Sequence, residues 1–354
     1  MNITVTKAPA SRRAQANLDN PAFGEIFSDH MFLMNYRDGG WGAATLIPYG
    51  PLPMLPSMSA LHYGQIVFEG LKAFRQKNGA VALFRPQKFY ERFARSCRRL
   101  AIPAVSREQF IGAVKAVVRE DAAWVPQKQG HSLYLRPFVF ASESFLGVRA
   151  SRAYTFMVIA SPVGNYYKEG VKPVRLTTSL AYIRAAKGGL GDVKTPANYA
   201  ASLLAAEEAR EQGFAQVIWL DAIERRYLEE VGAMNIFCVI GGELITPPLE
   251  GTILPGVTRD SVLALAKAWG IAAVERRIAI DELYDARQKG TLREVFGSGT
   301  AAVISPVGEI RHGDTTLTVN GGAIGPLAQR LYDAITGIQY GEAADTFGWM
   351  EKVE

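Results

Sequence analysis

Lys194 is the residue of this chain with the best setting for covalent chemistry. It stands in the segment GLGDVKTPANY at 189–199, where a glycine-rich turn leads into a helix that we expect to begin near Pro196. A lysine amine forms a Schiff base with a carbonyl compound only when it is deprotonated, which partial burial or a nearby positive charge favours. Lysines in such turns are mostly solvated, so this interpretation depends on the other motifs of the chain.

A carboxylate that could complement a cation opens an apolar strand. Glu230 lies in YLEEVGAMNIF, and the alternative is that it is an exposed residue at the strand end, as we expect for its neighbour Glu229. An inward-facing glutamate needs a cationic partner, because burying an unpaired carboxylate is costly.

Two segments have the composition of phosphate-binding turns. LPGVTRDSVLALAKAWG places Gly256, Val257 and Thr258 at a helix N-terminus, where free amides and the helix dipole attract anions. FGSGTA at 296–301 offers backbone and the Thr300 hydroxyl. Each signal alone is weak, since such threonines usually only cap helices and such glycines usually only form turns. The chain has no GxxxxGK[ST] motif, which argues against a nucleoside triphosphate.

Arg136 shares one face of an expected strand with two aromatic residues. In HSLYLRPFVF at 131–140, side chains repeat every second residue, so Tyr134, Arg136 and Phe138 point the same way. Arg136 is then either an edge residue whose charge reaches solvent or an anion-binding residue in an apolar pocket. The strand pattern leaves both open.

Composition excludes several classes of protein. The chain has 39 basic and 34 acidic residues, a net charge of +5, and they are interspersed, which argues against a nucleic-acid partner. Cys97 and Cys238 lie far apart and the four histidines form no metal-binding motif, so we expect a cytoplasmic protein without a metal. Apolar runs such as 231–240 are about half the ~20 residues of a membrane helix. Residues 1–20 resemble a mobile arm, with an organellar transit peptide as the alternative.

The 354 residues exceed the roughly 250–300 that one core supports, so we expect two domains. We place a small N-terminal α/β domain at 1–165, a polar linker at 166–176 and a larger domain at 177–354. Expected hairpins turn at 38–40 and 78–79. Helices are expected at 59–70, 84–103, 106–124, 198–213, 258–270, 281–290 and 326–341. Strands are expected at 131–140, 154–163, 174–180, 215–221, 234–248, 272–280 and 293–310. In the helix that follows Lys194, we expect Leu203 and Leu204 on the apolar face.

Taken in order, these motifs resemble the branched-chain amino acid aminotransferases, members of the fold-type IV class of pyridoxal-phosphate enzymes. The resemblance rests on SALHYGQIVFEGLKAFR, SLYLRP, SPVG, GDVKTPANYA, EEVGAMNIF, TPPLEGTILPGVTR, FGSGTA and IQYG. It implies a two-domain α/β and α+β fold like that of D-amino acid aminotransferase, with the active site at the domain seam and the cofactor bound by the C-terminal domain. It also implies a homodimer.

The resemblance implies a role for each cofactor-binding residue. Lys194 would carry pyridoxal 5'-phosphate as an internal aldimine and move the catalytic proton. Tyr199 would contact the cofactor O3' and Glu230 the pyridine nitrogen. The phosphate would contact four residues: Arg92, Val257, Thr258 and Thr300.

The implied reaction is ping-pong amino transfer between L-leucine, L-isoleucine or L-valine and 2-oxoglutarate. Arg136 would receive the side-chain carboxylate of glutamate, and the turn at Thr300 and Ala301 the α-carboxylate. Ala233 stands where some relatives have a substrate-contacting threonine. The remaining expected pocket residues are Phe23, Tyr63, Phe68, Tyr134, Val148 and Tyr166.

Two alternatives remain at this stage. One is another fold-type IV enzyme, a D-amino acid aminotransferase or an aminodeoxychorismate lyase, which should lack SLYLRP with its paired Tyr134 and Arg136. The other is a non-catalytic protein that binds a phosphorylated ligand through the PGVT and GSGT segments.

Overall fold

The computed structural model describes residues 1–164 and 172–353, and the chain divides into two compact units. Among the described residues, unit 1 comprises 1–164, 193–196 and 337–353, and unit 2 comprises 172–192 and 197–336. The sequence-based boundaries instead assigned everything after 176 to the second domain. Residues 337–353 join unit 1 because strand β18 (Met350–Lys352) pairs with β6 (Val81–Phe84). Of the linker predicted at 166–176, residues 166–171 lie outside the described residues.

Unit 1 is built on a sheet with the strand order β1-β3-β2-β8-β7-β5-β6-β18, and β4 pairs with β7. Its other strands are β1 (Ile3–Val5), β2 (His30–Arg37), β3 (Gly40–Pro48), β4 (Ile66–Phe68), β5 (Leu71–Arg75), β7 (Ser132–Ala141) and β8 (Tyr154–Val163). Its helices are η1 (Arg13–Gln15), α1 (Ser59–Tyr63), α2 (Pro86–Arg99), α3 (Arg107–Glu120) and η2 (Ala122–Trp124). The hairpins predicted at 38–40 and 78–79 are confirmed.

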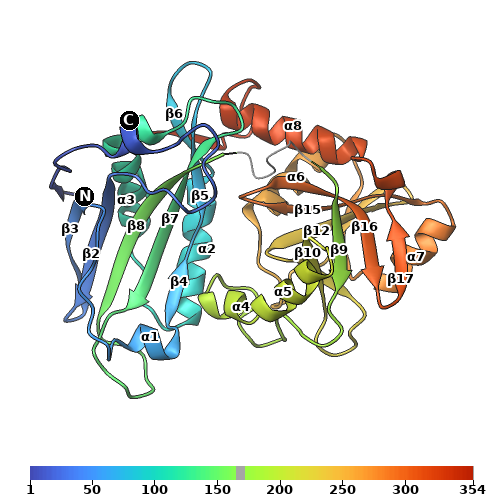
Figure 1. Ribbon diagram of the computed structural model, residues 1–354, viewed down its shortest axis with the longest axis horizontal. Coiled ribbons are helices and arrows are strands. Elements are labelled where there is room, and N and C mark those ends of the chain that lie inside the picture. Colours follow the sequence, from blue (N-terminus) through green and yellow to red (C-terminus); the bar gives the residue numbers. More distant parts are fainter. Residues whose placement is uncertain (165–171, 354) are drawn as a thin grey trace. The chain divides into compact units, whose positions relative to one another are not determined.

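Helices α2 and α3 pack together, and α3 lies against β2, β7 and β8 on one face of the sheet (Figure 1). The predicted spacing of Phe89, Phe93 and Cys97 on α2 is confirmed, because all three are at most 2% exposed. Phe93 lies 5.1 Å from Phe110 of α3, ring centre to ring centre. Helix α3 begins at a capping box formed by Ser106.

The helix predicted at 59–70 is wrong beyond its first turn. Helix α1 ends at Tyr63 because Gly64 takes a left-handed conformation with φ 61° and caps it. Ile66 and Val67, which were predicted on a helix face, belong to β4 and pair with β7. Two β-branched residues after a glycine favour this strand over a continued helix.

Unit 2 contains a second sheet, with the order β11-β10-β9-β16-β15-β12-β13-β14 and β17 paired to β16. Its strands are β9 (Val174–Thr178), β10 (Gln216–Leu220), β11 (Leu228–Val231), β12 (Met234–Ile240), β13 (Glu243–Thr246), β14 (Ala273–Glu275), β15 (Leu292–Gly299), β16 (Val303–His312) and β17 (Thr315–Thr318). Its helices are α4 (Pro196–Ala200), α5 (Leu203–Glu211), α6 (Val257–Ala268), α7 (Ile280–Gln288), η3 (Asn320–Gly322) and α8 (Pro326–Tyr340), of which α4 and α8 begin or end in residues of unit 1. The segments predicted as single strands at 234–248 and 293–310 are hairpins, and 272–280 is strand only at β14.

The helix predicted at 198–213 is interrupted between α4 and α5. Its predicted apolar face is also wrong, because Leu203 is 64% exposed and Leu204 is 58% exposed. Helix α5 instead packs Ala205 and Ala209 in a cluster with Phe214, Val217 and Trp219. Alanines permit close approach of the helix to β10, so the small residues rather than the leucines form the contact.

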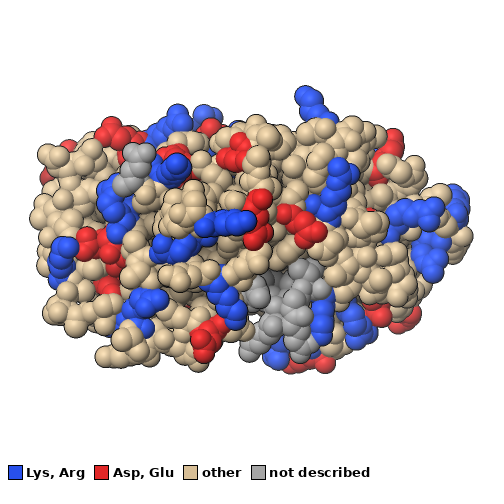
Figure 2. Space-filling model, turned by 90° about the horizontal axis from the view of Figure 1, so that it is seen from above, with Lys and Arg blue, Asp and Glu red and all other residues tan. Residues whose placement is uncertain are grey.

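The described surface carries mixed charge. On the face shown in Figure 2, Lys and Arg side chains are interspersed with Asp and Glu side chains. Among the described residues, none of the helices has the length and apolar character needed to cross a bilayer. The same residues contain no group of three or more His, Cys, Asp or Glu side chains suited to a metal ion.

Candidate active site

The structure assigns the predicted site residues to both units. Unit 1 contains Phe23, Tyr63, Phe68, Arg92, Tyr134, Arg136, Val148 and Lys194, and unit 2 contains Tyr199, Glu230, Ala233, Val257, Thr258, Thr300 and Ala301. Tyr166 lies outside the described residues.

Lys194 is held in unit 1 by its backbone. Its amide donates to Ser96 Oγ on α2 at 3.0 Å, and its carbonyl accepts from the Phe68 amide at 3.1 Å. The next residue, Thr195, is fully buried and donates its hydroxyl to Ile66 O at 2.8 Å. Lys194 is half-buried, with Nζ 5.0 Å from the centre of the Phe68 ring. The amine is thus fixed beside an aromatic face rather than extended on a free loop.

Arg92, the predicted phosphate contact on α2, is 6% exposed and forms a two-point ion pair. Its Nε donates to Glu69 Oε1 at 2.7 Å and its Nη2 to Glu69 Oε2 at 2.9 Å. Glu69 is fully buried and also accepts from the Gly70 amide at 3.1 Å. Sequence reasoning missed Glu69, although a single carboxylate in the apolar segment QIVFEGLKAF was a visible signal.

Arg136 lies among aromatic side chains in unit 1. Its guanidinium carbon is 4.8 Å from the centre of the Phe68 ring, and its Nη2 donates to the Tyr134 hydroxyl at 3.1 Å. Phe23 packs edge-on against Tyr134 at 4.7 Å between ring centres. Among the described residues, the buried Arg136 Nε has no hydrogen-bond partner. A buried donor without an acceptor suits the binding of an anion in an apolar setting.

Two other predicted pocket residues of unit 1 are exposed. Tyr63 is 45% exposed and donates its hydroxyl to Leu146 O, and Val148 is 87% exposed. In unit 1 taken alone, these side chains do not form a buried wall.

Glu230 is buried in unit 2, as its predicted role requires. It is 3% exposed, and its Oε1 accepts from the Leu254 amide at 2.7 Å. Arg184 Nη2 lies 3.3 Å from the same oxygen and also donates to the carbonyls of Gly191 and Thr252. No local pattern marked Arg184 as the partner of Glu230, because the two are distant in the chain.

The prediction that Glu229 is exposed is wrong, since it is 6% exposed. Strands β10 and β11 pair Trp219 with Glu230 and Leu220 with Leu228, so Glu229 is the extra residue of a β-bulge. Burial raises the pKa of Glu229, while the nearby Thr252 hydroxyl and the Arg184 guanidinium oppose that rise. Two consecutive carboxylates are thus buried near one guanidinium.

The two predicted phosphate-binding turns lie near each other in unit 2 because both adjoin Asn235. Asn235 pairs with Ser298 of β15 on one side and with Glu230 of β11 on the other. Its side chain donates to Leu254 O at 2.9 Å, and a Cβ added to Gly256 would lie 2.0 Å from its Oδ1. Adjacent strands are about 4.8 Å apart, so Glu230 and Ser298 are separated by roughly 10 Å.

The residues of these turns suit a phosphate. Helix α6 follows Gly256 without a side-chain cap, and Val257 and Thr258 in its first turn are buried. First-turn amides have no intrahelical acceptor and point along the positive end of the helix dipole. Thr300 and Ala301 form the turn between β15 and β16. The buried Ser298 Oγ has no hydrogen-bond partner among the described residues.

Tyr199 and Ala233 occupy less buried positions in unit 2. Tyr199 is half-buried on α4, and its carbonyl accepts from the amide and hydroxyl of Ser202. Ala233 is exposed in the tight turn between β11 and β12, after Gly232 with φ 54°.

The arrangement in unit 2 fits a phosphorylated, protonated aromatic ring. A buried carboxylate suits a ring N–H⁺, and the N-terminus of α6, which adjoins Asn235 beside Glu230, suits a phosphate. In agreement with this chemistry, residues 66–310 match the family model of class IV aminotransferases.

Full-length relatives specify the family further. The chain is 52% identical over 354 residues to branched-chain-amino-acid aminotransferase 2 of Bacillus subtilis strain 168, which covers 100% of this chain and 96% of the relative. It is 49% identical over 342 residues to the branched-chain-amino-acid aminotransferase of Mycolicibacterium smegmatis, and the match covers 95% of this chain and 93% of that relative. The chain belongs to the branched-chain-amino-acid aminotransferase family.

Solved structures show the same fold. The branched-chain amino acid aminotransferase of Escherichia coli aligns with a TM-score of 0.76 and 29% identity, over 92% of this chain and 99% of that one. A second structure is the branched-chain aminotransferase of the thermophilic archaeon Thermoproteus uzoniensis, solved with norvaline. It aligns with a TM-score of 0.75 and 28% identity, over 92% of this chain and 100% of that one. The fold is therefore that of the fold-type IV aminotransferases, as predicted.

Proposed function

We propose that this protein transfers the amino group between L-leucine, L-isoleucine or L-valine and 2-oxoglutarate, using pyridoxal 5'-phosphate. The observation that carries the proposal is Glu230, a carboxylate 3% exposed in the same part of unit 2 as the N-terminus of α6. Relatives with about half of their residues identical are named branched-chain-amino-acid aminotransferases. Other similar structures of branched-chain amino acid aminotransferases contain pyridoxamine 5'-phosphate or N-(5'-phosphopyridoxyl)-L-glutamate.

When bound, the cofactor supplies an aldehyde that condenses with amines and an electron-withdrawing ring that stabilises negative charge at Cα. Glu230 would accept a hydrogen bond from the ring nitrogen and favour its protonated state. The amide of Val257 and the hydroxyls of Thr258 and Thr300 would hold the phosphate, because all lie at a helix terminus or a turn suited to anions. Arg92 would add positive charge and Tyr199 would orient the ring through O3'.

Lys194 would act as the catalytic base. Its Nζ would remove the proton from Cα of the bound amino acid, and it would return that proton to complete the amino transfer. The backbone contacts of Lys194 with Ser96 and Phe68 fix where the amine can reach. Such positioning contributes to catalysis because the base need not be ordered during the reaction.

Arg136 would let one pocket accept both kinds of substrate. Its unpartnered Nε and the hydroxyl of Tyr134 could bind the side-chain carboxylate of glutamate. Phe23 and Phe68 would provide apolar surface for a branched side chain. Thr300 and Ala301 would bind the α-carboxylate, with Ala233 in the neighbouring turn, and Tyr63, Val148 and Tyr166 would complete the pocket.

The proposal includes a cytoplasmic homodimer. Size-exclusion chromatography with light scattering measures the mass of the assembly. A monomeric mass would contradict the dimer.

The activity is tested by assaying the protein, loaded with pyridoxal 5'-phosphate, with 2-oxoglutarate and L-leucine, L-isoleucine, L-valine or D-alanine. We expect activity with the three L-amino acids, and we expect Lys194→Ala to lose at least about 10³-fold in kcat. Lys289→Ala, at an exposed position of unit 2, is the matched control and should keep the wild-type rate. Preference for D-alanine, or full activity of Lys194→Ala, would refute the proposal.

A further inference from the structure

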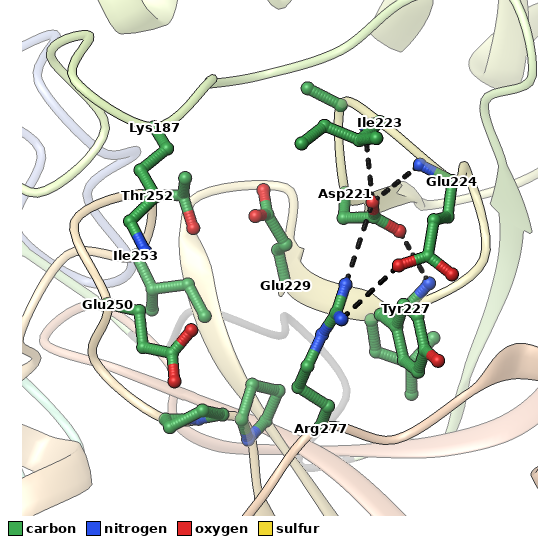
Figure 3. A pocket seen from close by; sticks show the side chains of 14 residues that line it. Lys187, Asp221, Ile223, Glu224, Tyr227, Glu229, Glu250, Thr252, Ile253 and Arg277 are labelled. Carbon is green, nitrogen blue, oxygen red and sulfur yellow. Dashed lines mark hydrogen bonds and ion pairs between the residues drawn. The ribbon is translucent and has the colours of Figure 1, made fainter.

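A cavity of about 220 Å³ lies within unit 2, and none of the residues predicted for the active site lines it. It opens to solvent between the loop after β10, β11 and the segment that follows β13. Its lining residues are Lys187, Asp221, Ala222, Ile223, Glu224, Tyr227, Leu228, Glu229, Pro247, Pro248, Glu250, Thr252, Ile253 and Arg277 (Figure 3).

Glu229 is the unsatisfied group of this cavity. It is 6% exposed, and its Oε2 has no hydrogen-bond partner among the described residues. Figure 3 shows Glu229 between Thr252 on one side and Asp221 on the other. A buried carboxylate oxygen without a donor is costly, so it is suited to a ligand that brings one.

Of the two basic residues that line the cavity, Arg277 is already engaged by acids. Arg277 Nη1 lies 3.3 Å from Glu224, its Nη2 lies 3.8 Å from Asp221, and its guanidinium stacks 3.5 Å from the centre of the Tyr227 ring. Asp221 also accepts from the amides of Glu224 and Tyr227 at 2.8 Å each. These interactions satisfy Asp221 and Glu224 locally and leave Glu229 as the acceptor for a ligand.

The size and walls of the cavity restrict that ligand. At about 30 Å³ per water, the space corresponds to roughly seven waters, below the roughly 300–1,000 Å³ of pockets for drug-sized ligands. Pro247, Pro248 and Ile253 give it an apolar side, and Lys187 is exposed at its rim. The described residues contain no metal-binding cluster, so an organic cation fits better than a metal ion.

We propose that this cavity binds a small organic ammonium ion whose N–H donates to Glu229 Oε2. The ammonium group belongs either to a simple amine or to a free amino acid. In an amino acid the carboxylate would pair with Lys187, and the short side chain would pack on Pro247 and Ile253.

A ligand at Glu229 would also be felt at Glu230. Arg184 forms an ion pair with Glu230 at 3.3 Å and acts electrostatically on Glu229. Thr252 lines the cavity beside Glu229, and its carbonyl accepts from Arg184. Neutralising the charge of Glu229 would therefore strengthen the hold of Arg184 on Glu230.

The test is a calorimetric titration of the holoenzyme in its pyridoxamine-phosphate form, which has no aldehyde to condense with an amine. The probes are propylammonium chloride and L-2-aminobutyrate. We expect both to bind, and we expect Glu229→Gln to raise both dissociation constants about tenfold or more. Lys187→Gln should weaken only L-2-aminobutyrate if amino acids are the source of the ammonium group.

The matched control is Glu243→Gln, an equal charge change at an exposed position of β13 that does not line the cavity. It should leave both affinities unchanged. The proposal is overturned if neither probe binds, if Glu229→Gln binds as tightly as the wild type, or if Glu243→Gln weakens binding equally. Failure of the transaminase activity would leave this result intact, because the titration measures binding without turnover.

Discussion

The two units each bury an acid–base cluster, and the clusters differ in how completely their groups are paired. In unit 1, Arg92 contacts both oxygens of Glu69 at 2.7 and 2.9 Å. In unit 2, Arg184 lies 3.3 Å from one oxygen of Glu230, while its own Nε and Glu229 Oε2 have no hydrogen-bond partner among the described residues. The first cluster is closed and the second retains polar groups without partners.

The difference suggests what each cluster does. A bidentate pair satisfies its own charge, so it holds α2 against the strand next to Glu69 and fixes Arg92 for a further anion. A buried polar group without a partner is costly unless a ligand completes it. For the Glu229 oxygen we propose a small ammonium ion, while Glu230 of the same cluster would contact the protonated pyridine ring.

The largest expected effect concerns the closed pair. Glu69→Gln should reduce the free energy of unfolding by about 3–5 kcal/mol, because it leaves the Arg92 charge buried without its carboxylate. The matched change Glu230→Gln should cost less, since Arg184 keeps two carbonyl acceptors and the nearby Glu229. Urea denaturation measures both. Equal losses would show that the two clusters do not differ in stability.

Within unit 2, the two neighbouring glutamates should differ in their effect on catalysis. In the assay with L-leucine and 2-oxoglutarate, Glu230→Gln should lower kcat by about 10²–10³-fold, because a neutral amide no longer favours the protonated ring nitrogen. Glu229→Gln should stay within a fewfold of the wild type. If the two variants lose activity equally, Glu230 has no special contact with the cofactor.

Lys72 tests how unit 1 tolerates a buried cation outside the Glu69–Arg92 pair. Burial lowers the pKa of Lys72 from 10.5 to about 8. Between these values the unfolded chain binds more protons than the folded one, so stability rises as the pH increases from about 8 to about 10.5. Relative to Lys72→Met, the wild type should gain on the order of 2 kcal/mol over this range. Parallel pH profiles of the two proteins would contradict the burial of a charged Lys72.

The smallest expected effect concerns Arg136, which differs from the fully paired Arg92 of unit 1 in having a donor without a partner among the described residues. Because Arg136 Nε has no partner among the described residues, we expect it to serve substrate rather than the fold. Arg136→Ala should slow the half-reaction with glutamate about tenfold more than that with leucine, because only glutamate has a side-chain charge to pair. Single-turnover absorbance measures each half-reaction. Equal losses would place Arg136 outside the side-chain pocket.

Local patterns predicted much of the fold. The Asp38-Gly39-Gly40 turn and the four-residue spacing of Phe89, Phe93 and Cys97 were sufficient, because turn chemistry and helix periodicity are set by neighbours in sequence. The prediction that Leu203 and Leu204 form an apolar helix face was wrong, because the break between α4 and α5 and the packing on β10 depend on tertiary contacts. Ile66 and Val67 became a strand because β7 offers a partner more than 70 residues away.

Motifs in the sequence predicted the candidate site residues. They did not predict the residues that form ion pairs with them. Lys194 and Glu230 stand in recognisable segments, so their types and places could be read directly. Glu69 pairs with Arg92 across 23 positions, and Arg184 reaches Glu230 across 46. The burial of Glu229 results from a bulge that only the pairing of β10 with β11 creates. Such contacts depend on strand register, which no local pattern specifies.

The most direct measurement is borohydride reduction of the protein loaded with pyridoxal 5'-phosphate, followed by digestion and mass spectrometry. We expect a stable phosphopyridoxyl mass on the peptide that contains Lys194. A label on another lysine, or no covalent label after reduction, would contradict it.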